Sequence, residues 1–232
     1  MAPSIGFVFM ATRADRTVPE ARALIDAALA LGVANVGFKD VGLPRAALKE
    51  LAAAIRAGGA SAFFEVVSLD RDAELASAAA AADLGVDWLL GGVRAREVAP
   101  IARSAGVRYA PFPGRVVGHP SVLEGALAEI ADSARAIAEV DGVAGLDLLA
   151  YRWSGDVPAL MRAVIGAVAS PVIVAGSIDR ESRIAAVAAS GAAGFTVGSA
   201  AIEGVFAAPA DDFNAQIRAI QRAVAAQGEA WR

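Results

Sequence analysis

The chain has 232 residues, of which 56% are hydrophobic and 20% charged, and this composition excludes a disordered protein. Its 21 basic and 25 acidic side chains give a formal charge of −4, so neither nucleic acid nor an acidic membrane surface is expected as a partner. Cysteine is absent and histidine occurs once, which excludes disulfides, a catalytic thiol, thiolate metal sites and a multi-histidine zinc site.

The mean hydropathy is high, at +0.52, because alanine is abundant. No stretch of 18 residues is free of both charge and glycine, so a membrane span is not predicted. No basic residue precedes the first apolar run, which favours a first strand over a signal peptide. We therefore expect a cytoplasmic protein.

Short apolar segments alternate with helical patterns along the chain, as is typical of a parallel sheet. The predicted strands cover residues 5–10, 35–39, 62–67, 88–90, 108–112, 146–151, 171–175 and 194–197. The clearest helical patterns cover about 19–31, 44–57, a short segment at 199–202, and a closing helix at about 211–227.

Three capping patterns mark helix starts. Thr17 and Glu20 have the spacing of a capping box before the first helix, and Asp70 can cap the helix after the third strand. After the long loop that follows the fifth strand, Ser121 and Glu124 repeat the capping-box spacing.

The eight βα units recur at intervals of about 25 to 30 residues, a length that suits a (β/α)₈ barrel. Several helices end in a glycine just before the next strand, as a left-handed cap requires. An open doubly wound sheet is the rival architecture, but the lack of a long crossover favours closure. We expect an α/β fold, a single TIM barrel that spans residues 1–232 as one domain.

The second predicted strand indicates which side chains point into the barrel. Asn35, Gly37 and Lys39 share one face, while Val36 and Phe38 share the other, which should contact the helices. Lys39 would then lie at the carboxyl-terminal rim, where barrel active sites are found.

Two small-residue turns follow the last two strands, Gly176-Ser177 and Gly198-Ser199. Glycine allows the backbone to approach a ligand, and serine adds a hydroxyl donor. The short helix at 199–202 would direct its free N–H groups at an anion. Tight βα turns alone could explain these glycines, but two in succession at these strands predict a phosphate site.

With these turns, residues 171–204 resemble the phosphate-binding TIM-barrel superfamily, which includes the histidine-biosynthesis barrels, phosphoribosylanthranilate isomerase, pentulose-phosphate epimerase and the sugar-acid aldolases. The resemblance implies the barrel fold and a small phosphorylated substrate, and it does not choose a reaction.

A narrower, partial resemblance is to (5-formylfuran-3-yl)methyl phosphate synthase. Lys39 and the turn Ala-Gly-Ser-Ile at 175–178 match that family, whose second-strand lysine forms a Schiff base. Its second lysine, on strand four, is replaced here by Gly91-Gly92, so the exact activity is not carried over. The aspartate that precedes the lysine in orotidine-phosphate-type decarboxylases is also missing, and that chemistry is rejected.

Lys39 is one of two lysines, and burial in a barrel mouth is expected to lower its pKa and free the amine. It could then act as Schiff-base nucleophile or base, or simply anchor an anion. Glu65, on the neighbouring strand, could pair with it as proton shuttle or as a structural ion pair. Asp147 is expected deep in the barrel as a further catalytic or structural carboxyl.

Other candidates lie at the same rim, in the loops after strands one, two, five and six. The candidates for substrate binding are Arg13, Asp40, Arg115, His119, Tyr151 and Arg152, with Asp15 beside Arg13.

The leading hypothesis is an enzyme that forms a carbanion, enolate or Schiff base next to a carbonyl of a small phosphorylated metabolite, with an aldolase-type lyase favoured over an aldose–ketose isomerase or epimerase. No cofactor and no metal are expected. A non-catalytic phosphometabolite-binding protein and a metal-assisted epimerase that uses Glu65 and Asp147 are alternatives. A homo-oligomer is compatible with the alanine-rich helices.

Overall fold

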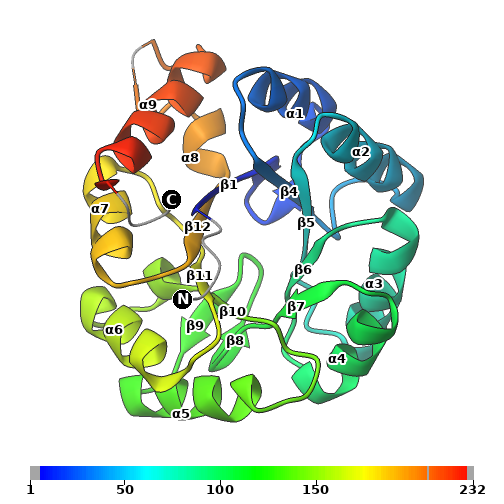
Figure 1. Ribbon diagram of the computed structural model, residues 1–232, viewed down its shortest axis with the longest axis vertical. Coiled ribbons are helices and arrows are strands. Elements are labelled where there is room, and N and C mark those ends of the chain that lie inside the picture. Colours follow the sequence, from blue (N-terminus) through cyan, green and yellow to red (C-terminus); the bar gives the residue numbers. More distant parts are fainter. Residues whose placement is uncertain (1–5, 208, 229–232) are drawn as a thin grey trace.

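The computed structural model describes residues 6–207 and 209–228. Within these ranges, eight parallel strands form one sheet that curves into a barrel, and helices surround it (Figure 1). The order in the sheet is β10-β11-β12-β1-β4-β5-β6-β7. These strands are β1 (Gly6–Met10), β4 (Asn35–Lys39), β5 (Ser61–Val66), β6 (Trp88–Gly91), β7 (Arg108–Ala110), β10 (Leu146–Leu148), β11 (Val172–Val174) and β12 (Gly194–Val197).

Backbone hydrogen bonds close the ring between β7 and β10. The Ala144 N–H donates to the Tyr109 carbonyl at 2.7 Å, and the Asp147 N–H donates to that of Pro111 at 3.0 Å. The predicted (β/α)₈ TIM barrel is therefore confirmed, and the carboxyl ends of its strands meet at one rim.

The helices form the outer ring in Figure 1, and two small hairpins lie at the rim. The helices are α1 (Ala21–Ala30), α2 (Arg45–Ala57), α3 (Arg71–Leu84), α4 (Ala95–Ser104), α5 (Leu127–Ala138), α6 (Val157–Ala167), α7 (Glu181–Ala189), α8 (Ser199–Ile202) and α9 (Phe213–Ala225), with a 3₁₀ turn η1 (Ala150–Arg152). The hairpins are β2 (Thr12–Arg13) with β3 (Arg16–Thr17), and β8 (Arg115–Val117) with β9 (Val122–Glu124). None of the described helices has the length and apolar character needed to cross a membrane.

The alternating faces of the strands build two separate cores. Val36 and Phe38 belong to the outer core between strands and helices, as predicted. The inner core fills the barrel with Val8, Met10, Phe63, Trp88, Leu90, Ala110 and Ile173.

Close packing in the inner core requires a glycine on β4. A Cβ at Gly37 would lie 2.5 Å from the Met10 sulfur and 2.9 Å from the Phe63 Cβ. Phe63 also stacks on Trp88, with ring centroids 5.9 Å apart. The barrel is therefore filled below its rim, and access to Lys39 is from the carboxyl-terminal end of the strands.

Two of the three capping predictions are wrong. The N-cap of α1 is Glu20, without a side-chain cap, while the Thr17 hydroxyl bonds to both the N–H and the carbonyl of Lys39, at 2.8 Å each. Ser121 precedes β9, so Ser121 and Glu124 belong to a hairpin rather than a helix start. Asp70 does cap α3, by accepting from the Ala73 N–H.

Several strand ends also differ from the prediction. The sixth sheet strand, β10, stops at Leu148, because the chain turns into η1. The predicted first residue of the first strand, Ile5, lies outside the described residues. The segments predicted at 35–39, 194–197 and 199–202 have the observed bounds of β4, β12 and α8.

Candidate active site

A cavity of about 90 Å³ lies at the carboxyl-terminal rim of the barrel. Its wall combines the ends of β1, β4, β5, β11 and β12 with the two turns after β11 and β12. It is lined by Met10, Thr12, Asp15, Lys39, Glu65, Leu149, Arg152 and residues 175–178 and 196–200.

Strand register places Lys39 directly beside Glu65, because these two residues are paired across β4 and β5. The Lys39 Nζ lies 3.0 Å from Oε1 of Glu65 and 2.7 Å from Oδ1 of Asp15. Lys39 is only 5% exposed, and the two carboxyl groups are more deeply buried. The amine is thus enclosed between two acids at the cavity wall.

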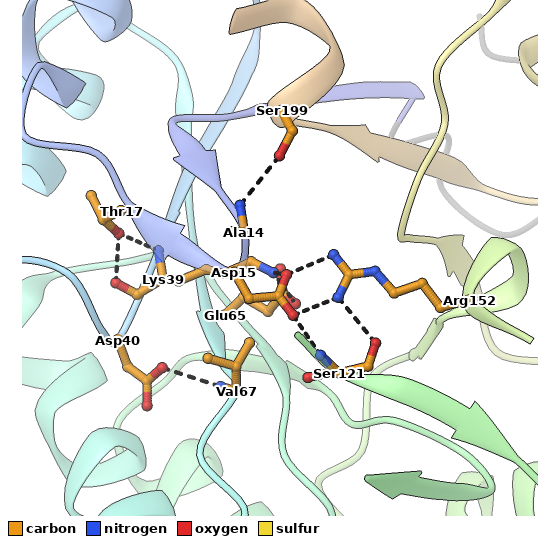
Figure 2. Close-up of polar contacts among 10 residues, drawn as sticks. All are labelled: Ala14, Asp15, Thr17, Lys39, Asp40, Glu65, Val67, Ser121, Arg152 and Ser199. Atoms are coloured by element: carbon orange, nitrogen blue, oxygen red, sulfur yellow. Dashed lines mark hydrogen bonds and ion pairs between the residues drawn. The ribbon is translucent and has the colours of Figure 1, made fainter. Parts of the chain in front are cut away.

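Asp15 is the centre of the polar network in Figure 2. It lies in the turn of the β2–β3 hairpin, where Ala14 and Asp15 both have positive φ angles, 46° and 59°. Arg152 grips its carboxylate with two nitrogens, one at 2.7 Å, and the Ser121 N–H donates to it at 2.8 Å. The strained turn thereby brings Asp15 over Lys39 and ties the β8–β9 hairpin to the mouth.

These contacts determine the charges of Asp15 and Lys39. Burial alone would raise the pKa of Asp15, but the hydrogen bonds from Arg152 and the charge of Lys39 hold it well below the usual range. Burial alone would lower the pKa of Lys39, but Glu65 and Asp15 raise it above its ordinary value. The prediction of a free Lys39 amine is therefore wrong for the resting protein, because the two acids raise its pKa by more than burial lowers it.

The pKa values of two further acids, Glu65 and Asp147, are raised, whereas that of Asp15 is lowered. Burial raises the pKa of Glu65, although Lys39 acts against the rise. Burial and the nearby Glu65 raise the pKa of Asp147 well above its ordinary value. Asp147 is fully buried, as predicted, and neither of its carboxyl oxygens has a hydrogen-bond partner among the described residues.

The two small-residue turns border the same cavity. Gly176 and Ser177 both have left-handed backbone, with φ of +79° and +53°. Gly198 is the N-cap of α8, and Ala201 is the first residue whose N–H donates within this helix. The N–H groups of Ser199 and Ala200 come before it and have no acceptor in the helix. The N–H groups of residues 176–178 likewise donate to no other described residue.

Five rim candidates lie away from the cavity. Arg13 is exposed and pairs with Glu20 and Glu203, and Arg115 pairs with Glu124 on the β8–β9 hairpin. His119, in the turn of that hairpin, is also exposed.

Asp40 and Tyr151 are turned towards the helices. The Asp40 carboxylate accepts from the Val67 N–H and the Ser77 hydroxyl, at 3.1 and 3.0 Å. The Tyr151 ring lies under the Arg183 guanidinium of α7, 4.7 Å from its centre. Each of these two side chains has a local partner away from the cavity. Of the rim candidates, Arg152 and Asp15 line the cavity.

Sequence reasoning placed Asp15 at the rim without a role and missed Ser121 as its backbone partner. The one local signal is the group of polar residues Thr12, Arg13 and Asp15 shortly after an apolar strand. Within the described ranges, no three His, Cys, Asp or Glu side chains gather as a metal site would require.

Comparison with known proteins places this chain among the TIM barrels. No protein-family model matches it, and no curated protein matches it significantly. Solved structures do. A chain of the Amycolatopsis orientalis BexX/CysO complex superposes with a TM-score of 0.65 at 22% identity, over 98% of this chain and 91% of that chain.

Two further structures show the same likeness. The native KDPGal structure has a TM-score of 0.66 at 17% identity and covers 96% and 95% of the two chains. The tryptophan synthase alpha chain of Legionella pneumophila has a TM-score of 0.65 at 14% identity and covers 97% and 93%. Such low identities establish the fold and leave the activity to the site itself.

Proposed function

We propose that this protein is an enzyme that acts on a small phosphorylated carbonyl compound, most simply as an aldolase-type lyase. The observation that carries the proposal is the Lys39 amine, held 2.7 and 3.0 Å from two buried acids in a cavity that also reaches the turns at 176–178 and 198–200. The Lys39 side chain and two turns whose backbone N–H groups have no described acceptor thus border one small space.

The phosphate would lie against the two turns. Backbone N–H groups without acceptors favour an oxyanion, and the left-handed Gly176-Ser177 turn borders the cavity. Burial raises the pKa of Asp147 well above its ordinary value, so this buried acid adds little negative charge beside Lys39 and Arg152. The limited negative charge also favours an anionic ligand.

The lyase mechanism begins with transfer of the Lys39 proton to Glu65, whose raised pKa suits a proton acceptor 3.0 Å away. The free amine then attacks the substrate carbonyl carbon, and the carbonyl oxygen leaves as water. Glu65 returns its proton to that departing oxygen and then takes the proton of the β-hydroxyl, while the bond between the α and β carbons breaks and its electron pair moves into the iminium. An aldehyde leaves and an enamine stays on Lys39. Protonation of the enamine by Glu65 and hydrolysis of the iminium release the second product and restore the Lys39 ammonium. Phosphate binding at a distance would position the reacting carbon.

Borohydride trapping tests this mechanism. The protein is treated with sodium borohydride and a panel of short phosphorylated aldehydes and ketones, and modified peptides are mapped by mass spectrometry. We expect a reduced adduct on Lys39, lost in Lys39→Met. Lys49 is a matched control, because it is the only other lysine and pairs with Asp83 on the surface. Lys49→Met should retain the adduct, and an adduct-free wild type would overturn the Schiff-base mechanism.

An isomerase or epimerase is the second candidate, and the raised pKa of Lys39 favours it. An ammonium group could donate a hydrogen bond to the substrate carbonyl while Glu65 removes the adjacent proton. This reaction would exchange substrate hydrogen for deuterium in heavy water without any adduct at Lys39. Glu65→Gln should abolish the exchange, and exchange at the wild-type rate in that variant would refute this role.

A further inference from the structure

Arg152 has hydrogen-bonding capacity that its contacts do not use. A guanidinium carries five N–H donors. Nη1 donates to Oδ2 of Asp15 and to the Ser121 carbonyl at 3.1 Å, and Nη2 donates to Oδ1 of Asp15 at 2.7 Å (Figure 2). The Nε–H and the second Nη2–H have no acceptor among the described residues.

These two free donors lie on the same edge of the planar group, since Nη2 is the terminal nitrogen beside Nε–H. Such an edge matches two oxygens of a phosphate or carboxylate. Arg152 and Gly176 line the same cavity, and a Cβ placed on Gly176 would lie 3.0 Å from Nε and 2.7 Å from Cγ of Arg152. The open edge therefore adjoins the turn that carries the unbonded amides.

The guanidinium is also held in place before any ligand arrives. Its side chain is 18% exposed, and the Asp15 carboxylate that grips it is 1% exposed. The Ser121 carbonyl fixes a third donor. A cation that is already oriented loses little conformational freedom when it binds an anion.

We propose that Arg152 is the charged ligand of the substrate phosphate, which it contacts with its Nε and Nη2 edge while its other edge stays on Asp15. This inference rests on the proposed function. The amides of the two turns supply neutral donors, and among the described residues that line the cavity Arg152 is the arginine that supplies positive charge.

The arrangement also couples the phosphate to the reacting amine. Asp15 contacts Arg152 with both oxygens and Lys39 with one of them. A phosphate on the open edge of Arg152 would therefore stand at a fixed place relative to Lys39. The anion on this edge is then the phosphate of the substrate, and a carboxylate is the alternative that the test below separates from it.

Calorimetric titration with inorganic phosphate and with glycerol 3-phosphate tests the proposal. Lys in place of Arg152 retains a cation near Asp15 but cannot offer two donors in one plane. We expect Arg152→Lys to weaken both ligands about tenfold to a hundredfold. Arg16→Ala is the control, because Arg16 is an exposed arginine next to Asp15 and should keep the wild-type affinity. Thermal melts of each variant confirm folding.

The outcomes are distinct. Wild-type affinity in Arg152→Lys would overturn this inference and leave the phosphate site intact. The same titration with pyruvate, a carboxylate without phosphate, is the third arm. If Arg152→Lys binds glycerol 3-phosphate normally but loses pyruvate, the edge binds a carboxylate and the inference is also overturned. If the wild type binds neither phosphate ligand, the proposed function fails together with this inference.

Discussion

Asp147 is expected to destabilise the barrel at neutral pH, so Asp147→Asn should make the protein more stable. The side chain is fully buried, and neither carboxyl oxygen has a partner among the described residues. Burial and the nearby Glu65 raise its pKa well above the ordinary value of 3.8. The folded protein therefore retains a proton that the unfolded chain releases.

The sign of the effect follows from this difference. With a raised pKa in the folded state, the contribution of Asp147 to stability is complete below pH 3.8 and is lost as pH rises towards the folded pKa. Asparagine does not ionise, so the advantage of the variant should grow with pH. We expect a gain of about 1 to 3 kcal/mol in the free energy of unfolding at pH 7. For a chain of this size the melting temperature should rise by about 2 to 12 °C.

Urea unfolding of wild type and variant at several pH values between 4 and 7 measures this gain. Asp132→Asn is the control, since that carboxylate is 70% exposed and should change stability by less than about 0.5 kcal/mol. A variant that is less stable than the wild type at pH 7, or a difference that does not depend on pH, would show that Asp147 is ionised and paired. The reasoning about its burial would then be wrong.

Two other variants probe the phosphate turn. Gly176→Ala should lower the free energy of unfolding by about 1 to 2 kcal/mol and weaken phosphate binding, because its Cβ would collide with the Arg152 side chain. Gly191→Ala is the control, because it places alanine in the same left-handed backbone but without a collision. Calorimetry should show that its phosphate affinity is unchanged. Arg183→Ala should also weaken phosphate binding, because Arg183 donates to the Ser177 carbonyl and braces the turn. Arg180→Ala removes a neighbouring charge without that bond, and equal losses in both variants would contradict the bracing role.

The barrel itself could be predicted from local sequence patterns. Apolar runs, glycine stops and the alternation of strands with helices specify each βα unit within a short stretch of chain. The period of two on the strand at 35–39 correctly predicted that Lys39 points inward and Phe38 outward. The contact between Lys39 and Glu65 followed as well, because consecutive parallel strands lie side by side in this fold.

The ends of the sixth strand and the hairpin over the mouth could not be predicted in the same way. The capping-box spacing of Ser121 and Glu124 is also compatible with a β-hairpin, and Thr17 found a better partner in the backbone of Lys39 than in a helix terminus. Local spacing does not say which distant backbone group will compete for a hydroxyl or a carboxylate.

The sequence by itself determined that this protein is a barrel with an inward lysine beside a glutamate, and with two glycine turns at the same rim. Only the tertiary structure decided the charge of that lysine. Asp15 reaches Lys39 from 24 residues away, and Arg152 reaches Asp15 from 137 residues away. Electrostatic interactions depend on distance and burial in space, and therefore the pKa of the amine rose where its burial alone predicted a fall.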